Sequence, residues 1–248
     1  MVNRIPIPEV ASRLLEGLFP HTCRLCRLPA AARWPLCQPC LGDLRTNDAC
    51  CARCAIPLPP AAGETLPRYC GACLRAPPPF QRVVAPWLYS EELAYLIHCW
   101  KYRGERRLTA LLAGLWLQRV PEPGGVDLMV PVPLHWRRLW RRGFNQSELL
   151  CHQWRRASPA LAAVPVDHRL VRRRRATATQ SGLTAARRAV NLRHAFTVEG
   201  ACANLRIAIV DDVLTTGATA ASLARALRRA GASHVEVWCL ARTPAPGE

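Results

Sequence analysis

The chain is short of acidic residues and holds a single lysine. Its 248 residues include 17 Asp plus Glu against 34 Lys plus Arg, a formal net charge of +17, and Lys101 is the only lysine. Residues 101–193 carry most of this excess, with 19 basic and 5 acidic side chains. A charge of this size favours an anionic partner or substrate. The preference for arginine carries little weight, because arginine suits phosphate but a bias toward it also has a genomic origin in many chains.

Long apolar runs are absent as well. The longest stretches, such as residues 108–117, are far too short to span a bilayer, and the N-terminus lacks the basic start and the small-residue cleavage site of a signal peptide. No Gly-x-x-x-x-Gly-Lys-Ser/Thr sequence occurs, which disfavours a P-loop ATPase. We therefore expect a cytoplasmic protein without a membrane contact, in which residues 1–20 form a short amphipathic helix.

Cysteine, by contrast, is abundant. Thirteen cysteines in a chain of cytoplasmic character favour metal binding over disulfides. Two Cys-x-x-Cys knuckles complete one tetrahedral zinc site of the structural type. Eight cysteines form four such knuckles, namely Cys23/Cys26, Cys37/Cys40, Cys51/Cys54 and Cys70/Cys73. The knuckles pair either sequentially or in an interleaved order, and Cys50 is a spare or substitute ligand.

The cysteine-rich part is expected to end at a proline-rich stretch. Residues 75–80 predict a stiff linker by their composition. We therefore divide the chain into an N-terminal helix with a double zinc-ribbon module, residues 1–79, and a larger domain, residues 80–248. The remaining cysteines lie in apolar patterns and are expected to be core residues; they are Cys99, Cys151, Cys202 and Cys239.

The most specific signal is Leu-Arg-Ile-Ala-Ile-Val-Asp-Asp-Val-Leu-Thr-Thr-Gly-Ala-Thr at residues 205–219. The apolar run 207–210 predicts a buried strand, which Asp211 and Asp212 follow directly. Two carboxylates at the end of a strand can accept charge-strengthened hydrogen bonds from vicinal ribose hydroxyls. The N–H groups and the dipole of the helix that follows favour a phosphate. The phosphate contacts are assigned to Thr215, Thr216, Gly217, Ala218 and Thr219. An ordinary capped helix is the less favoured alternative.

Two helices precede this motif, after a short predicted strand at residues 83–89. Ser90 is a plausible N-cap for the first helix, and the second carries leucines on one face from residue 108. Lys101 and Arg103, at the end of the first helix, either face an anion or suit the helix dipole.

A second basic segment follows a predicted strand at residues 126–132. An arginine-rich loop with a glycine, ahead of a helix at residues 146–156, is how a fold presents cations to a pyrophosphate. The loop residues assigned to this role are Arg137, Arg138, Arg141, Arg142 and Gly143. The alternative is a solvated basic loop whose tryptophans pack.

A third predicted strand, residues 166–171, leads into a long polar and basic run. Loops of this length in compact domains are often lids, and a reactive ribosyl cation needs protection from water. The lid residues are Arg172, Arg174, Thr177, Gln180 and Arg188. A nucleic-acid contact is the competing interpretation of the same run.

These residues resemble known families. Residues 205–219 resemble the signature of type I phosphoribosyltransferases, which bind 5-phosphoribosyl 1-pyrophosphate (PRPP). Almost the whole chain is similar to the ComF family, through the cysteine knuckles and further motifs. These are Lys-Tyr-x-Gly at 101–104, Val-Pro-Val-Pro-Leu-His at 130–135, Arg-Gly-Phe-Asn-Gln at 142–146, the Arg-x-Arg-x-Thr-x-x-Gln run ending at Gln180, and Arg188 with Asn191. The lid spacing resembles that of glutamine amidophosphoribosyltransferases, but the chain lacks their N-terminal cysteine nucleophile.

The resemblance implies an α/β fold of the type I phosphoribosyltransferase class, a Rossmann-like parallel sheet flanked by helices, behind the zinc ribbons. It implies PRPP binding with Mg²⁺, with Asp211 and Asp212 as catalytic residues at the ribose, and phosphoribosyl transfer to an unknown acceptor. It also links the chain to DNA uptake in natural competence, on single-stranded DNA beside a helicase. No general base for an acceptor stands out, since Glu148 and His135 are weak candidates.

The rival hypothesis is a non-catalytic protein that binds single-stranded DNA and uses PRPP only as a regulatory ligand. Zinc ribbons and arginine-rich stretches are compatible with it. Aromatic residues are few, at 6%, but Trp136, Trp140 and Phe144 alternate with arginines and could stack on bases.

Overall fold

A parallel sheet lies at the centre of the structure. The computed structural model describes residues 22–30, 34–60, 67–173 and 195–245, so the helix predicted at residues 1–20 lies outside the described residues. The sheet has the order β1-β7-β6-β3, and β2 also pairs with β7. Its strands are β1 (Arg82–Val84), β2 (Trp87–Leu88), β3 (Leu128–Pro131), β6 (Arg206–Leu214) and β7 (His234–Arg242). All of them pair in parallel, so their carboxyl ends meet at one edge.

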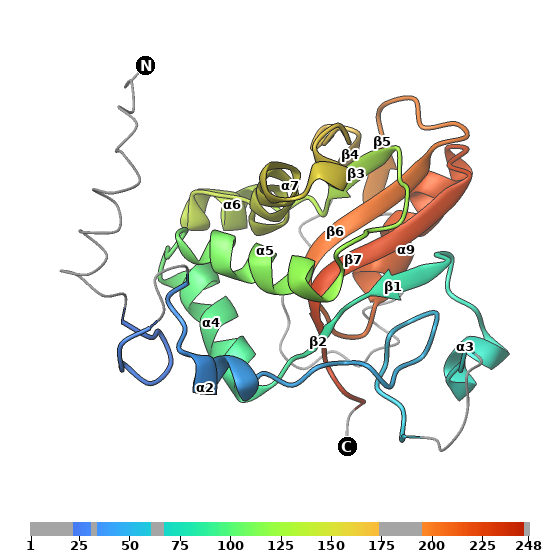
Figure 1. The fold of residues 1–248 in the computed structure, drawn as a ribbon. Helices are drawn as coiled ribbons and strands as arrows, with labels where there is room; N and C mark the ends of the chain where they lie inside the picture. The colour runs from blue at the N-terminus through green and yellow to red at the C-terminus, as the bar shows by residue number, and fades with distance from the viewer. Residues whose placement is uncertain (1–21, 31–33, 61–66, 174–194, 246–248) are drawn as a thin grey trace.

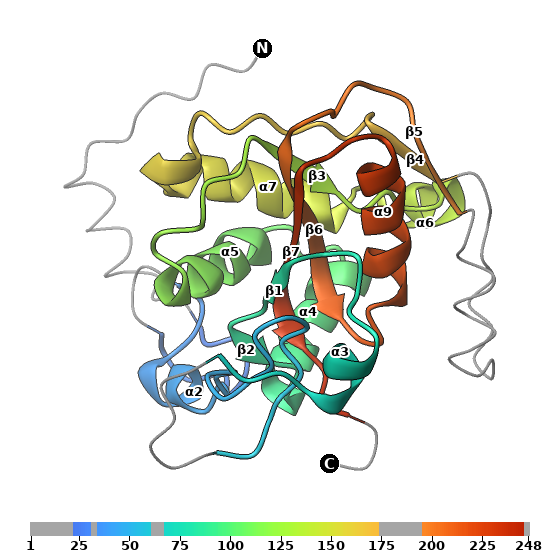
Figure 2. The same ribbon diagram turned by 90° about the vertical axis from the view of Figure 1, so that its right-hand side faces the viewer.

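Helices cover both faces of this sheet (Figures 1 and 2). They are α4 (Glu91–Tyr102), α5 (Leu108–Arg119) and α7 (Gln146–Ala157) on one face and α9 (Ala218–Arg229) on the other. Ala208 and Val210 of β6 pack in the buried cluster that includes α4, α5 and α7. Ile207 and Ile209 pack in the cluster that includes α9. An apolar strand of this kind is expected where helices cover both faces of a sheet.

Smaller elements complete the described residues. They are α2 (Gln38–Gly42), α3 (Gly71–Arg75), α6 (Trp136–Arg142), the 3-10 helix η1 (Pro159–Leu161), β4 (Val171–Arg173) and β5 (Phe196–Val198). β4 and β5 form an antiparallel pair, in which Arg173 lies opposite Phe196. The two helices of the cysteine-rich part each begin directly after a cysteine, Cys37 for α2 and Cys70 for α3.

The predicted fold class is confirmed, with four differences in detail. The strand expected at residues 83–89 is two short strands, β1 and β2, which pair in succession with β7. The strand expected at residues 166–171 is wrong, because only Val166 bridges to β3 and the strand itself is β4, which starts at Val171. β6 continues past residue 210 and includes both acids. The loop expected after β3 contains the helix α6.

The cysteine-rich part is packed against the sheet domain. Cys23, Cys37 and Cys40 belong to the same buried cluster as the inward residues of α4 and α5. The division of the chain at residue 79 stays a prediction, and buried contacts cross it. Within the described segments, no helix combines the length and the apolar character needed to cross a membrane.

Candidate functional site

The segment from Asp211 to Thr219, called the acid turn below, joins β6 to α9. Gly217 is the N-cap of α9 and has φ 74°, a left-handed conformation that favours glycine. Within the described residues, the backbone N–H groups of residues 215–217, 219 and 220 have no protein acceptor, and that of Ala218 makes only a long contact of 3.4 Å to Thr216 Oγ1. The first turn of α9 holds no acidic residue. The turn therefore presents unpaired donors at the positive end of a 12-residue helix.

The two acids of the turn have different surroundings. Asp212 is 5% exposed and is held by three donors. Lys101 Nζ lies 2.7 Å from its Oδ1, the N–H of Val213 donates to the same oxygen at 2.6 Å, and Gln146 Nε2 donates to its Oδ2 at 2.7 Å. Lys101 therefore faces a carboxylate of its own chain, where the sequence left open an external anion or the helix dipole.

Asp211 is only partly buried and has weaker partners. Its Oδ1 accepts a hydrogen bond of 2.9 Å from the N–H of Asp212. Burial and the charge of Asp212 raise its pKa from 3.8 to about 7, although the Asp212 N–H, the charge of Lys101 and the hydroxyl of Ser147 act in the opposite direction. A carboxyl with such a pKa is only partly ionised at neutral pH, and a further cation or hydrogen-bond donor would favour its ionised form.

Cationic groups approach the acid turn from the neighbouring strands. β3 pairs with β6, so the segment after β3 opens at the same edge of the sheet as the acid turn. Burial and the charges of Arg173, Arg137 and Arg138 lower the pKa of His135. Burial and the charge of Arg138 lower the pKa of Arg173, while Asp211 raises it. Arg173 thus interacts electrostatically with Asp211, and Arg138 and His135 interact with Arg173.

The predicted pyrophosphate loop is in fact helical. α6 takes up Trp136–Arg142, the Nδ1 of His135 accepts from the N–H of Arg137 at its start, and Gly143 ends it with φ 74°. Arg137 lies over the ring of Trp136 and Arg142 over that of Tyr102, at 5.2 and 4.8 Å from the ring centroids. Arg138, Arg141 and Gly143 are the other three residues that were predicted to bind pyrophosphate. Whether these residues bind pyrophosphate stays a prediction.

Little of the predicted lid lies in the described residues. Arg172 is on β4, and its Nε lies 2.8 Å from Glu199 at an exposed position. Arg174, Thr177, Gln180 and Arg188 lie outside the described residues. The role of all five stays a prediction.

The eight knuckle cysteines gather in two groups of four. Cys23, Cys26, Cys37 and Cys40 form one, and Cys51, Cys54, Cys70 and Cys73 form the other, with the sulfur atoms of each group within 4.8 Å of one another. The knuckles therefore pair sequentially, and Cys50 belongs to neither group.

The geometry of both groups fits zinc. Zn–S bonds of about 2.3 Å in a tetrahedron separate the sulfurs by about 3.8 Å, and the Cys26–Cys37 and Cys54–Cys70 separations are 3.5 and 3.6 Å. Burial raises the pKa of Cys23, but the N–H groups of Cys26, Cys37 and Leu25 outweigh it and lower the value to about 6. Equivalent N–H groups lower the pKa of Cys51 to about 7 against its burial. Backbone donors thus favour the thiolate form at one cysteine of each group, whereas burial raises the pKa of Cys40 and Cys73.

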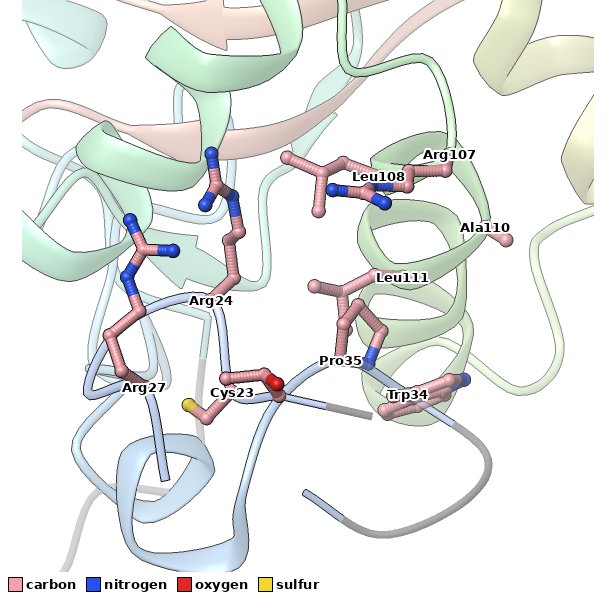
Figure 3. Close-up of a pocket in the computed structure, with 10 residues that line it drawn as sticks. Cys23, Arg24, Arg27, Trp34, Pro35, Arg107, Leu108, Ala110 and Leu111 are labelled. Carbon is pink, nitrogen blue, oxygen red and sulfur yellow. The ribbon is translucent and has the colours of Figure 1, made fainter. Parts of the chain in front are cut away.

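A pocket of 440 Å³ lies elsewhere, between the first cysteine group and the start of α5. Figure 3 shows Leu108 and Leu111 projecting from α5, with Pro35 beside Leu111 and Arg24 on the opposite side. Arg24 forms an ion pair with Glu105. The lining residues include none from the acid turn, so this pocket is not the predicted sugar-phosphate site.

Several residues at the acid turn were not predicted as part of the site. Gln146 and Ser147, in the first turn of α7, and Arg173 contact or face the acids, and only their positions next to predicted loops hinted at this. Glu148, a weak candidate base, lies near His168 Nδ1 at 3.5 Å and His152 Nε2 at 3.9 Å. The other weak candidate, His135, caps α6.

Comparison with known proteins adds the following. The double zinc ribbon domain family matches residues 14–74. The chain is 42% identical over 234 residues to DNA utilization protein YhgH of Salmonella typhimurium, covering 90% of this chain and 98% of that protein. It is 33% identical over 238 residues to competence protein F of Haemophilus influenzae, covering 92% and 100%. The solved structure of a purine phosphoribosyltransferase from Pyrococcus horikoshii aligns with 60% of this chain and 78% of that chain, at 18% identity and a TM-score of 0.32.

Proposed function

The chain belongs to the ComF family, together with competence protein F and DNA utilization protein YhgH, and we propose that it binds PRPP with Mg²⁺ at the acid turn in support of DNA uptake or utilization. A sugar phosphate offers a suitable group to each of two parts of this turn. One is an anion for the N–H groups at the start of α9, and the other is a hydroxyl or a cation for the partly buried carboxyl of Asp211.

The unpaired N–H groups of the acid turn are the observation that carries this proposal. They follow two acids at the carboxyl end of a strand, where ligands of open α/β sheets bind. In the proposal, residues 215–219 hold the 5-phosphate and the acids lie at the ribose. In the proposal, Arg173, which interacts with Asp211, and Arg138, which interacts with Arg173, face the pyrophosphate and its metal ion.

Phosphoribosyl transfer is the activity that such a site would support. The bond between the ribose C1 and the pyrophosphate oxygen breaks, the pyrophosphate leaves with the bonding electrons, and a nucleophile bonds to C1. In this proposal the chain contributes mostly electrostatics. Asp211 stabilises positive charge on the sugar, arginines stabilise the leaving group, and Mg²⁺, held with the pyrophosphate, would neutralise its charge.

Thermal unfolding tests the binding proposal. A ligand at 100 times its Kd stabilises a protein by about 2.7 kcal/mol, which raises the midpoint by about 5–10 °C for a chain of this size. We expect PRPP with Mg²⁺ to produce this shift in the wild type and in Asp43→Asn, whose acid is exposed just after α2, but not in Asp211→Asn. Absence of a shift in the wild type would contradict the proposal.

Binding of single-stranded DNA is a second candidate, favoured by α6. None of its residues is buried, and Trp136 and Trp140 are 66% and 86% exposed beside four arginines. Exposed aromatic rings next to guanidinium groups suit stacked bases and phosphates.

Fluorescence anisotropy of a labelled oligonucleotide tests this second candidate. Trp140→Ala should weaken binding severalfold, while Leu74→Ala, which removes an apolar side chain that is also largely exposed but far from α6, should not. Arg141→Ala should reduce the slope of log affinity against log salt by about 1. Equal affinity in Trp140→Ala and the wild type would exclude α6 as the DNA surface.

A further inference from the structure

The two adjacent acids of the acid turn point to different parts of the structure. Along β6, Ala208 and Val210 pack with α4, α5 and α7, and Asp212 continues this row by contacting Lys101 of α4 and Gln146 of α7. Asp211 lies opposite Cys239 in the β6–β7 pairing, and Cys239 belongs to the buried cluster that includes α9. Successive residues of a strand face opposite sides. The acids are therefore not equivalent toward a ligand at the turn.

Asp212 has little capacity left for a ligand. Both of its oxygens are engaged by three donors at 2.6–2.7 Å, and its side chain is 8% exposed. A buried charged pair with good hydrogen bonds is costly to open, because the separated ions would lose partners in a region of low dielectric. A ribose hydroxyl could reach only the remaining lone pair of Oδ2, beside Gln146, on a side chain that is largely buried.

The choice of lysine at position 101 is informative. The chain uses arginine at all its other basic positions, and its single lysine lies in the last turn of α4 with a side chain only 15% exposed. An ammonium group is compact, whereas a guanidinium is planar and wide. The space beside Asp212 is filled by Gln146, which is 4% exposed. A compact cation fits this place, and the pair joins the end of α4 and the start of α7 to β6.

We propose that Lys101 and Gln146 are positioning residues, which hold Asp212 as a fixed structural anion and leave Asp211 as the acid that contacts the ribose. This inference rests on the proposed function, since PRPP is the ligand. Lys101 acts on the ligand only through the two acids. Its charge compensates that of Asp212, and through space it also favours the ionised form of Asp211.

The groups that face Asp211 define what a pH test measures. They are Asp212 on β6, Lys101 from α4, Ser147 from α7, Arg173 from β4 and Cys239 from β7. Removal of the Lys101 charge leaves Asp212 as the nearest uncompensated charge. The ionisation of Asp211 should then move to higher pH by about one unit or more.

The experiment measures PRPP affinity by titration calorimetry with Mg²⁺ between pH 5.5 and 8.5. The variants are Lys101→Met, Lys101→Arg and Gln146→Leu in the full chain. The matched controls are Arg119→Met, which removes a charge from the far end of α5, and Gln153→Leu, which makes the same change on α7 away from the acids.

We expect both Lys101 variants and Gln146→Leu to bind PRPP about tenfold more weakly at pH 7, whereas the controls stay within twofold. In Lys101→Met alone, the affinity for PRPP should recover at higher pH, because Asp211 ionises at a higher pH in this variant. Lys101→Arg keeps the charge and should show a loss that does not depend on pH.

Two results would overturn the inference. One is a Lys101→Met profile that matches the wild type, and the other is a loss of affinity in Asp212→Asn that exceeds the loss in Asp211→Asn without any change in unfolding midpoint. If the wild type binds no PRPP, the proposed function fails. The positioning role of Lys101 is then tested by a measurement that needs no ligand. Carbon-13 NMR titration of the Asp211 carboxyl should show a higher pKa in Lys101→Met than in the wild type, and an unchanged value would refute it.

Discussion

Removing one zinc ligand from each cysteine group should destabilise the protein to different degrees. Cys40 and Cys73 are a matched pair, because each is the last ligand of its group and they are 9% and 8% exposed. Cys40 packs in the buried cluster of α4 and α5, together with Cys23 and Cys37. Among the described residues, neither large buried cluster includes a cysteine of the second group. Loss of the first zinc should therefore loosen the main core.

The magnitude follows from the energy of a structural zinc. Such a site contributes about 10–16 kcal/mol of apparent binding energy at neutral pH, against a total stability of about 5–15 kcal/mol for a domain. One kcal/mol shifts the midpoint of a chain of this size by about 2–4 °C. If only a third of the zinc energy is coupled to the core, Cys40→Ser lowers the midpoint of the core transition by about 10 °C. Cys73→Ser should lower it by much less.

The assay combines metal analysis with calorimetry. Purified wild type should contain two zinc ions per chain, and Cys40→Ser and Cys73→Ser should each contain one. Cys50→Ser is the control next to Cys51, and it should keep both ions because Cys50 lies outside both groups. Equal losses of stability in Cys40→Ser and Cys73→Ser, or loss of an ion from Cys50→Ser, would refute the reasoning.

Three further changes test other parts of the fold. Glu236 is 2% exposed and accepts from Trp238, His234 and Arg82, which lower its pKa against burial; Glu236→Gln should cost on the order of 3 kcal/mol in urea unfolding at pH 7. Because the folded pKa is depressed, this contribution is present above pH 4.5 and should vanish as the pH falls below it. Gly114→Ala places a Cβ 2.6 Å from Trp34 and should lower the melting midpoint by a few degrees, while Gly42→Ala, with nothing within 4 Å, should not. Gly217→Ala, at φ 74°, should cost about 1 kcal/mol and abolish the PRPP-induced shift.

The parts of the fold that could be predicted from sequence depend on local patterns. The β6–turn–α9 unit combines an apolar run with a glycine and a helical repeat. Each of these signals can be recognised from a few consecutive residues. The four cysteine knuckles were equally clear. Their pairing was not, because sequence spacing does not determine which knuckles meet in space.

α6 was missed for a physical reason. Trp136, Leu139 and Trp140 recur at helical spacing, but the helix has only seven residues and buries none of them, and its arginines and Gly143 are also typical of a loop. Arginine is nevertheless a good helix former, and His135 supplies a cap. Local propensity decided the outcome where packing did not.

Contacts between distant residues were beyond the sequence. Gln146 and Asp212 are 66 positions apart, and their contact depends on the pairing of β3 with β6. Lys101 reaches Asp212 only because α4 packs on the face of β6 that Asp212 continues. The alternation of residues along a strand would have separated the two acids, but β6 was predicted to end before them.

The acid turn concentrates features that stability alone does not favour. Asp211 is placed beside a second carboxylate and partly withdrawn from water, which raises its pKa to about 7 and makes its ionised form unfavourable in the folded state. A few residues later, at the start of α9, several N–H groups have no acceptor among the residues that the structure describes. A simple anion would relieve the second feature and aggravate the first, and a simple cation would do the reverse. A phosphate ester that also brings hydroxyl donors or a metal ion relieves both at once. This pairing of opposite needs within nine residues favours a metal-bound sugar phosphate over a plain phosphate as the ligand.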